Sequence, residues 1–254
     1  MLHYHIAQLT DCHLQKEPTA TLYNICTLNS FQNTLRSAAQ HQPDLYLLTG
    51  DLSHDGSSES YQHIVTATST LSRPIAWIPG NHDHPATMQA IFEPSHLINH
   101  TVISLDPWQL ILLDSYWPGH IAGRLADQQL QQLAQHLQNQ KPTLIFLHHN
   151  ISEPVPINMG SMFANTDQLL DIIKPYQQYI KAIICGHVHT AYDFEFRGIR
   201  LLSTPSTCYQ FYIDNGQVKR TNQPPGYRML RLSSDGQFDT NVYYIANSTS
   251  NDYR

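Results

Sequence analysis

The chain has 254 residues, of which 41% are hydrophobic, and this is enough to build one well-packed core. Its formal net charge is −6 with only 14 lysines and arginines, so it is a poor electrostatic match for long nucleic acid. The four cysteines lack C-x-x-C spacing, which excludes a disulfide framework and a thiolate zinc site as readings of the sequence.

The N-terminus and the apolar content indicate the compartment. The chain begins directly with a strand-like alternation instead of a basic segment followed by an apolar run. No apolar stretch approaches the ~20 residues that a membrane span needs. We therefore expect a cytoplasmic protein without a membrane partner.

Short apolar runs recur along the first 190 residues and predict strands covered on both faces. The predicted strands are residues 2–9, 44–49, 75–78, 109–113, 143–147 and 182–185. Apolar residues at helical spacing lie between them. The four stripes are Phe31, Leu35, Ala38 and Ala39; Tyr61, Ile64, Val65 and Leu71; Leu130, Leu133 and Leu137; and Leu169, Leu170, Ile172 and Ile173. Asn165 and Thr166 are N-cap candidates for the last helix, which Pro175 is expected to end.

The last fifty residues change character. Turn signals stand at 214–216 and 234–236, and the second predicts a hairpin between residues 227–232 and 237–245. The whole pattern predicts a layered α/β protein that closes with antiparallel strands. We expect one domain over residues 1–246, with a core at 1–205, a C-terminal strand and hairpin region at 206–246, and a polar tail at 247–254.

Residues that bind metals follow five of the predicted strands. Because binding groups collect beyond the carboxyl ends of strands in such folds, we expect them to form one site. Asp, Asn and His together suit two ions of intermediate softness, although each segment alone could be an ordinary turn. The segments are Asp11-Cys12-His13, Gly50-Asp51, Gly80-Asn81-His82-Asp83, His148-His149 and Gly186-His187-Val188-His189.

The local patterns suggest how these residues are presented. Asp51 is the natural bridge between two ions, because it stands alone between Gly50 and a loop that returns at Gly56. A glycine before a ligand permits a tight turn and close backbone approach. The D-x-H and H-x-H pairs are expected to place two side chains on one side of an extended segment.

These motifs resemble the calcineurin-like metallophosphoesterase superfamily. They are D-x-H at 11–13, G-D-x-x-x-x-G at 50–56, G-N-H-D at 80–83, His at 148 and G-H-x-H at 186–189. The resemblance implies a four-layer α/β/β/α sandwich, here with a C-terminal antiparallel hairpin. It also implies two metal ions, Fe with Mn, for which Mn, Co or Zn can substitute, and it is compatible with a homodimer.

The resemblance implies a ligand assignment as well. One ion would be held by Asp11, His13, Asp51 and His189, and the other by Asp51, Asn81, His148 and His187. His148 and His149 are both candidates for the same ligand position, and we favour His148.

A narrower resemblance covers residues 3 to 245. Gly119, Gly123, Asn165, the T-P-S-T-C segment at 204–208 and the P-G-Y-R segment at 225–228 are similar to bacterial class III cyclic nucleotide phosphodiesterases, which act on cyclic AMP. This implies hydrolysis of a small cyclic nucleotide, 3′,5′-cyclic AMP, to 5′-AMP by attack of a metal-bridging hydroxide. The catalytic residues would be Asp51, Asn81 and His82. The substrate would contact His13, Asn81, His82 and His189. His82, held by Asp83 or another carboxylate, would donate a hydrogen bond or proton to the leaving oxygen.

Three alternatives remain open. A broader phosphodiesterase acting on 2′,3′-cyclic nucleotides or glycerophosphodiesters would use the same two-metal core, a nuclease is less favoured without a basic groove, and a scaffold would need no catalysis. Asn150 stands where relatives carry proline, and residues 151–163 after it are expected to border the substrate pocket. Tyr209, Phe211 and Tyr212 are expected in the core or an edge strand, with base stacking as the less favoured role.

Overall fold

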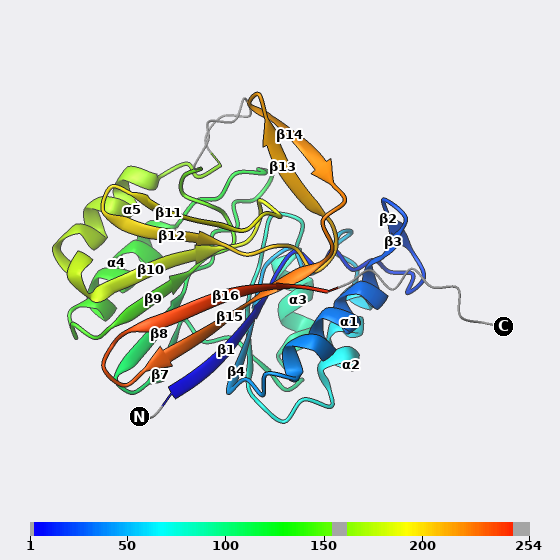
Figure 1. Ribbon diagram of the computed structural model, residues 1–254, viewed down its shortest axis with the longest axis horizontal. Coiled ribbons are helices and arrows are strands. Elements are labelled where there is room, and N and C mark those ends of the chain that lie inside the picture. Colours follow the sequence, from blue (N-terminus) through cyan, green and yellow to red (C-terminus); the bar gives the residue numbers. More distant parts are fainter. Residues whose placement is uncertain (1–2, 154–161, 246–254) are drawn as a thin grey trace.

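Two mixed β-sheets pack face to face, with helices on both outer sides (Figure 1). This computed structural model describes residues 3–153 and 162–245. The expected polar tail at 247–254 and the central part of the expected pocket loop, 154–161, lie outside those ranges. The arrangement confirms the predicted four-layer α/β/β/α sandwich. The division into a core and a C-terminal region at residue 205 stays a prediction.

The first sheet has six strands, and its central strands are parallel. β1 pairs with β4, and β4 with β5, in parallel, whereas β15 runs antiparallel to β1 and to β16. In spatial order the strands are β16 (Phe238–Tyr244), β15 (Gly226–Ser233), β1 (His3–Leu9), β4 (Leu45–Thr49), β5 (Ile75–Ile78) and β6 (Leu97–Ile98). The predicted C-terminal hairpin is thus confirmed and extends this sheet.

The second sheet also has six strands. β8, β9, β10 and β12 are parallel, and antiparallel strands close both edges. In spatial order the strands are β11 (Tyr192–Phe196), β12 (Ile199–Ser203), β10 (Ile180–Cys185), β9 (Thr143–Phe146), β8 (Trp108–Leu112) and β7 (Val102–Leu105). Every residue of β4, β5, β8 and β9 is buried, as the continuous apolar runs predicted.

The apolar core has three layers. One lies between the two sheets and includes Ile6, Leu47 and Phe146. A second lies beneath α1 (Thr27–Ala39), α2 (Ser58–Thr68) and α3 (Pro85–Phe92), and a third beneath α4 (Asp127–Leu137) and α5 (Thr166–Ile173). Within the described ranges, no helix has both the length and the apolar character needed to cross a membrane.

Two small hairpins lie outside the main sheets. β2 (Thr21–Leu22) pairs with β3 (Ile25–Cys26), and β13 (Gln210–Asp214) pairs with β14 (Gln217–Thr221). The predicted turn between β13 and β14 is present, with positive φ at both Asn215 and Gly216, as a type I′ turn requires. This hairpin projects beyond the sheets (Figure 1).

Several local expectations need correction. α5 begins where predicted, but the Asn165 side chain bonds the backbone N–H and C=O of Leu125 instead of capping the helix. The expected end of α5 before Pro175 is confirmed: the helix stops at Ile173, and Pro175 lies in the first turn of the 3₁₀-helix η1 (Lys174–Tyr179), where its missing N–H is tolerated. Leu71 lies beyond the end of α2. The sequence patterns also missed α3 and the β11–β12 pair.

Candidate metal centre

The candidate ligands follow the carboxyl ends of five neighbouring strands. They come after β1, β4 and β5 in the first sheet and after β9 and β10 in the second. Backbone hydrogen bonds join these strand ends: the N–H of Asp11 donates to Gly50 at 3.0 Å, that of His13 to Asp51 at 2.9 Å, and that of Gly186 to His148 at 3.0 Å. The predicted convergence of the five segments is therefore confirmed.

We had expected these segments to be extended, but their backbone is not. Five candidate ligands have a positive φ between 47° and 67°, a backbone conformation that residues other than glycine seldom adopt. Each such conformation costs roughly 1–3 kcal/mol, and such strain concentrates at functional sites. The two-residue spacing brings the pairs together through left-handed turns, not through strand alternation. The five residues are Asp11, His13, Asp51, His187 and His189.

Three of these side chains form a buried cluster. The Nε2 atoms of His13 and His189 lie 3.0 Å apart, and Nε2 of His189 lies 3.1 Å from a carboxylate oxygen of Asp11. All three residues are at most 3% exposed. Two imidazole nitrogens and a carboxylate therefore point at one small volume, as the ligands of a cation do.

Asp51 connects this cluster to a second group. Its Oδ2 lies 3.9 Å from Nε2 of His13 on one side and 3.4 Å from Nε2 of His148 on the other. The His187 ring lies 5.1 Å from the His148 ring. This central position is the one expected of a carboxylate that bridges two ions.

Hydrogen bonds fix two imidazoles with Nε2 toward the centre. Nδ1 of His148 lies 2.9 Å from the carbonyl oxygen of Thr49, and Nδ1 of His189 lies 2.8 Å from that of Tyr209. A carbonyl can only accept, so each Nδ1 donates and Nε2 is left available as a ligand atom.

The charges of the site also suit cations. Burial lowers the pKa of His13 to about 3 against the opposing effect of Asp51, and burial with His148 nearby lowers the pKa of His187 to about 3. Burial opposes the charged form of His148, but Asp51 outweighs it and raises its pKa to about 9. His13 and His187 are thus neutral at pH 7, as metal binding requires. An ion at His148 would have to displace the proton that Asp51 stabilises on that ring.

Buried polar atoms without partners provide a separate test of fit. Among the described residues, seven buried side-chain atoms make no hydrogen bond, and three of them lie at this site: Oδ1 of Asn81, Nε2 of His148 and Nε2 of His149. Buried polar atoms are nearly always satisfied, so three orphans at one site call for an explanation. Coordination of a metal ion explains the first two, and the residues present fit a metal centre.

Two of the glycines are required by close packing. A Cβ at Gly80 would collide with the carboxylate and the backbone nitrogen of Asp51, and a Cβ at Gly186 would collide with Thr10 and with the carboxylate of Asp11. Glycine therefore lets the candidate ligands approach one another, which extends its expected role as a turn former.

His82 lies at the edge of the site, where its ring forms a group of potential ligand atoms with His13 and His54. A role for His82 away from the metals stays a prediction. Its side chain is exposed, lines the pocket and stacks on His54 with ring centroids 5.1 Å apart. The expectation that Asp83 holds this ring is wrong. The Asp83 carboxylate accepts hydrogen bonds from the N–H groups of Leu52, Ser53 and Gly80 and from the Tyr61 hydroxyl.

Two further histidines lie beside the candidate ligands: His54, to which the sequence motifs gave no role, and His149, the less favoured candidate for the His148 position. His54 lies beside His82, with its Nδ1 3.4 Å from Nδ1 of His13. His149 is fully buried, its Nδ1 lies 2.8 Å from the Ser115 hydroxyl, and its ring lies 4.8 Å from the His187 ring. For His54, the one signal in the sequence was its position three residues after Asp51.

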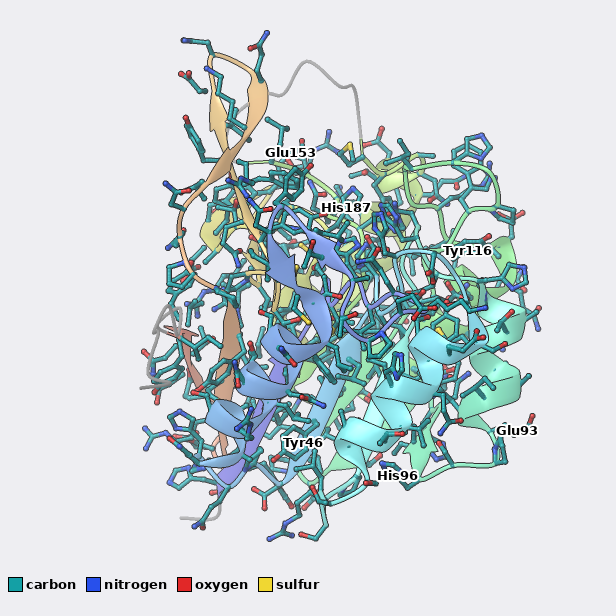
Figure 2. All side chains as sticks on the ribbon, turned by 90° about the vertical axis from the view of Figure 1, so that its right-hand side faces the viewer. Tyr46, Glu93, His96, Tyr116, Glu153 and His187 are labelled. Carbon is teal, nitrogen blue, oxygen red and sulfur yellow. The ribbon has the colours of Figure 1, made fainter. Side chains whose placement is uncertain are left out.

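A cavity of about 210 Å³ opens over the candidate ligands. His13, Asp51, Asn81, His187 and His189 contribute to its lining. In Figure 2, Glu153 and His187, which both line the cavity, lie below the projecting β13–β14 hairpin. Glu153 and Met162 belong to the expected pocket loop at 151–163 and line the cavity, so the described part of that loop borders the pocket as predicted.

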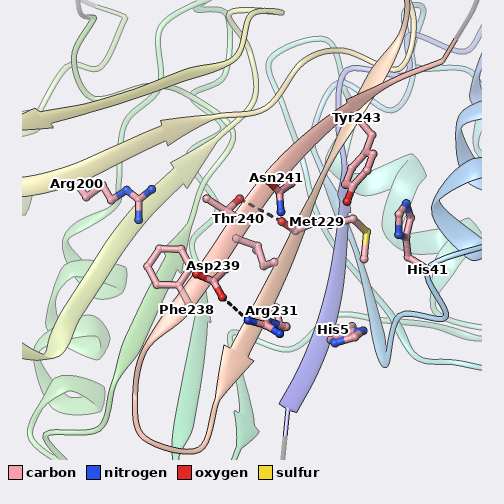
Figure 3. A pocket seen from close by; sticks show the side chains of 11 residues that line it. His5, His41, Arg200, Met229, Arg231, Phe238, Asp239, Thr240, Asn241 and Tyr243 are labelled. Carbon is pink, nitrogen blue, oxygen red and sulfur yellow. Dashed lines mark hydrogen bonds and ion pairs between the residues drawn. The ribbon is translucent and has the colours of Figure 1, made fainter.

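A larger cavity of about 580 Å³ lies away from these ligands, along β15 and β16 (Figure 3). Its two arginines are already paired, Arg231 with Asp239 and Arg200 with Asp193. None of the candidate metal ligands lines it, so it is not the site that the motifs predicted.

Relatives of known activity match almost the whole chain. A 3′,5′-cyclic adenosine monophosphate phosphodiesterase, CpdA, from Pseudomonas aeruginosa is 36% identical over 245 residues, which cover 93% of this chain and 88% of the relative. The protein of the same name from Vibrio vulnificus is 37% identical over 96% of this chain and 91% of its own length. A 3′,5′-cyclic-nucleotide phosphodiesterase from Nostoc is 33% identical over 93% of this chain and 91% of its own length.

Solved structures share the fold at lower identity. A dimetal phosphatase from Danio rerio superposes with a TM-score of 0.65 at 13% identity, covering 90% of this chain and 95% of its own. Residues 4–191 match the model of the Calcineurin-like phosphoesterase family. Together with the near full-length relatives, this match shows that the chain belongs to the calcineurin-like phosphoesterase family.

Proposed function

We propose that this chain hydrolyses 3′,5′-cyclic AMP to 5′-AMP at a centre of two metal ions. The observation that carries the proposal is the buried convergence of His13, His189, His148 and two carboxylates, with three imidazole Nε2 atoms facing inward. The relatives named as cyclic AMP phosphodiesterases support the substrate, because they align with nearly all of this chain.

The proposed ligands divide around Asp51. Asp11, His13, Asp51 and His189 would hold one ion, and Asp51, Asn81, His148 and His187 would hold the other. The position of Asp51 between His13 and His148 supports its bridging role. The orphan Oδ1 of Asn81 supports its place in the set. The contact of His148 with Asp51 at 3.4 Å favours His148 over His149. Fe with Mn is the proposed pair, for which Mn, Co or Zn can substitute.

When bound, the two ions would neutralise the phosphate oxygens and acidify a water for attack on phosphorus. The other contributions come from the chain. His13, Asn81, His82 and His189 line the pocket and would contact the phosphate there. As water adds to phosphorus and the bond to the 3′-oxygen breaks, the exposed His82 ring would donate a proton to that oxygen.

The lining of the pocket suits a diester with a single negative charge. Of the described residues that line it, none is lysine or arginine. The substrate's phosphate would therefore be neutralised by the metal centre itself, and a second phosphate would find no cationic partner there. A cytoplasmic location and a homodimer stay predictions.

Turnover of three substrates in parallel tests the proposal. Metal-reconstituted protein would be incubated with 3′,5′-cyclic AMP, 2′,3′-cyclic AMP and glycerophosphocholine, and the products would be resolved. We expect 5′-AMP from the first, with a loss of about 100-fold or more in Asn81→Ala, as removal of groups that stabilise the transition state causes. Asn99→Ala, an exposed amide away from the pocket, is the control.

The other outcomes are distinct. Faster cleavage of 2′,3′-cyclic AMP or glycerophosphocholine would overturn the substrate and keep the metal mechanism. Absence of turnover on all three, with two ions bound, would favour a scaffold.

A further inference from the structure

The pocket above the metal centre has a polar floor and an apolar wall. The candidate ligands form the floor. The wall is contributed mainly by the β13–β14 hairpin, through Phe211, Ile213 and Val218, and by Ile121 from another part of the chain. A metal site explains the floor but leaves the wall without a role.

The hairpin is held in register with the metal ligands. The backbone N–H of Phe211 donates to the carbonyl of His189 at 3.1 Å, and Nδ1 of His189 donates to the carbonyl of Tyr209. The Phe211 ring stacks on the His189 ring with centroids 5.0 Å apart. The wall therefore starts at a ligand of the proposed centre and has a fixed position relative to it.

The side chains of the wall and of the segment before it divide into two groups. Tyr209 is buried and stacks on His13 at 5.5 Å, so its ring packs against the ligands, as expected for a core aromatic. Farther out, Ile213 and Val218 are cross-strand partners in the hairpin. Val218 is 39% exposed and Ile121 is 61% exposed, although both line the pocket. Apolar side chains are thus open to solvent beside the site.

The charged residues of the hairpin are engaged elsewhere. Lys219 pairs with Asp214 at 2.6 Å, and the Arg220 guanidinium lies over the ring of Tyr23 and bonds its carbonyl. Neither residue lines the pocket. The group that this wall accepts is therefore uncharged, apolar on its faces and attached to the phosphate that the floor holds.

We propose that Phe211, Ile213, Val218 and Ile121 bind the base of the nucleotide and determine its preference over phosphodiesters without a base. The inference rests on the proposed function, since the phosphate must lie on the metal centre. Every nucleobase has an apolar π-face that packs against such side chains. A glycerophosphodiester carries no flat group to cover the wall.

A binding comparison tests this wall without turnover. Calorimetry on the metal-loaded protein would compare 5′-AMP with ribose 5-phosphate, which has the same sugar and phosphate but no base. We expect 5′-AMP to bind about 10-fold more tightly or better, as one stacked base contributes. In the double variant Ile213→Ser/Val218→Ser, the ratio of the affinity for 5′-AMP to that for ribose 5-phosphate should fall to about 3-fold or less. The affinity for ribose 5-phosphate itself should stay unchanged.

Two matched variants keep the test falsifiable. Lys219→Ser changes the neighbouring exposed position of the same strand and should leave the ratio unaltered. Val218→Thr keeps the shape and strand propensity of the side chain and should lower the ratio by a smaller factor. Equal affinity for the two ligands in the wild type, or an unchanged ratio in the folded double variant, would overturn the proposal. Failure to hydrolyse cyclic AMP with the ratio intact would instead overturn the proposed function alone.

Discussion

The Asp83 side chain joins two loops that carry candidate metal ligands. Its carboxylate accepts the N–H groups of Ser53 at 2.9 Å and Gly80 at 2.8 Å, and so joins the segment after Asp51 to the segment before Asn81. The motif G-N-H-D suggested a partner for His82, because the two residues are adjacent. Only the folded backbone shows that the carboxylate points away from that ring.

We expect Asp83→Ala to lower the free energy of unfolding by about 2–4 kcal/mol, because buried N–H donors lose their acceptor. Metal affinity should fall by roughly 10–100-fold, as for outer partners of metal ligands in general. Asp83→Asn keeps one acceptor oxygen and should therefore lose less stability and less metal affinity. Urea denaturation and metal titration measure the two effects, with the exposed Asp235→Ala as control. Unchanged metal affinity in Asp83→Ala would contradict this role.

At the scale of elements, polar side chains connect the two sheets beneath the metal centre. Arg228 of β15 is 3% exposed and donates to the carbonyl of Ser203, at the end of β12, at 2.7 Å. It also donates to the hydroxyls of Thr204 and Thr240. Thr204 in turn bonds Gln8 of β1, which bonds Thr49 of β4. This network holds together strand ends that candidate ligands follow.

Arg228→Ala should lower the free energy of unfolding by about 3 kcal/mol or more, since it leaves buried acceptors unsatisfied and opens a cavity. Arg228→Met fills more of the volume and should cost less. Arg231→Ala removes an exposed ion pair from the same strand and should change stability by less than about 1 kcal/mol. Denaturant titration of the three variants gives the comparison, and equal effects of the Arg228→Ala and Arg231→Ala changes would contradict it.

At the scale of the whole molecule, the proposed metal centre lies where the two sheets meet. Asp11, His13, Asp51 and Asn81 follow strands of the first sheet, and His148, His187 and His189 follow strands of the second. Bound ions would therefore cross-link the two halves of the sandwich. The stability of the whole fold should depend on metal as a result.

Removing the metal should lower the melting temperature of the protein. An ion present at 100 times its dissociation constant adds about 2.7 kcal/mol, which corresponds to roughly 5–10 °C for a chain of this size. Scanning calorimetry before and after chelation, with metal content measured alongside, checks this. Asp51→Asn should show a much smaller shift, because its bridge is weakened. An identical melting temperature with and without bound metal would refute a cross-linking role.

The sequence alone predicted the types of the candidate ligands, and it correctly predicted the buried strands. Both depend on residues close together in the chain: continuous apolar runs such as 75–78 and 143–147 mark the strands, and the motifs that follow them mark the candidate ligands. It could not determine the left-handed turns at Asp11 and His189, the true partner of Asp83 or the place of the β13–β14 hairpin. These depend on contacts between residues far apart in the chain, such as Phe211 with His189 and Ser53 with Asp83. α3 and the β11–β12 pair were missed although their signals are local: His84 and Pro85 begin α3, and a two-residue turn at Arg197-Gly198 joins β11 to β12. Only the tertiary structure, which brings distant segments together, decided how the site is held and what borders it.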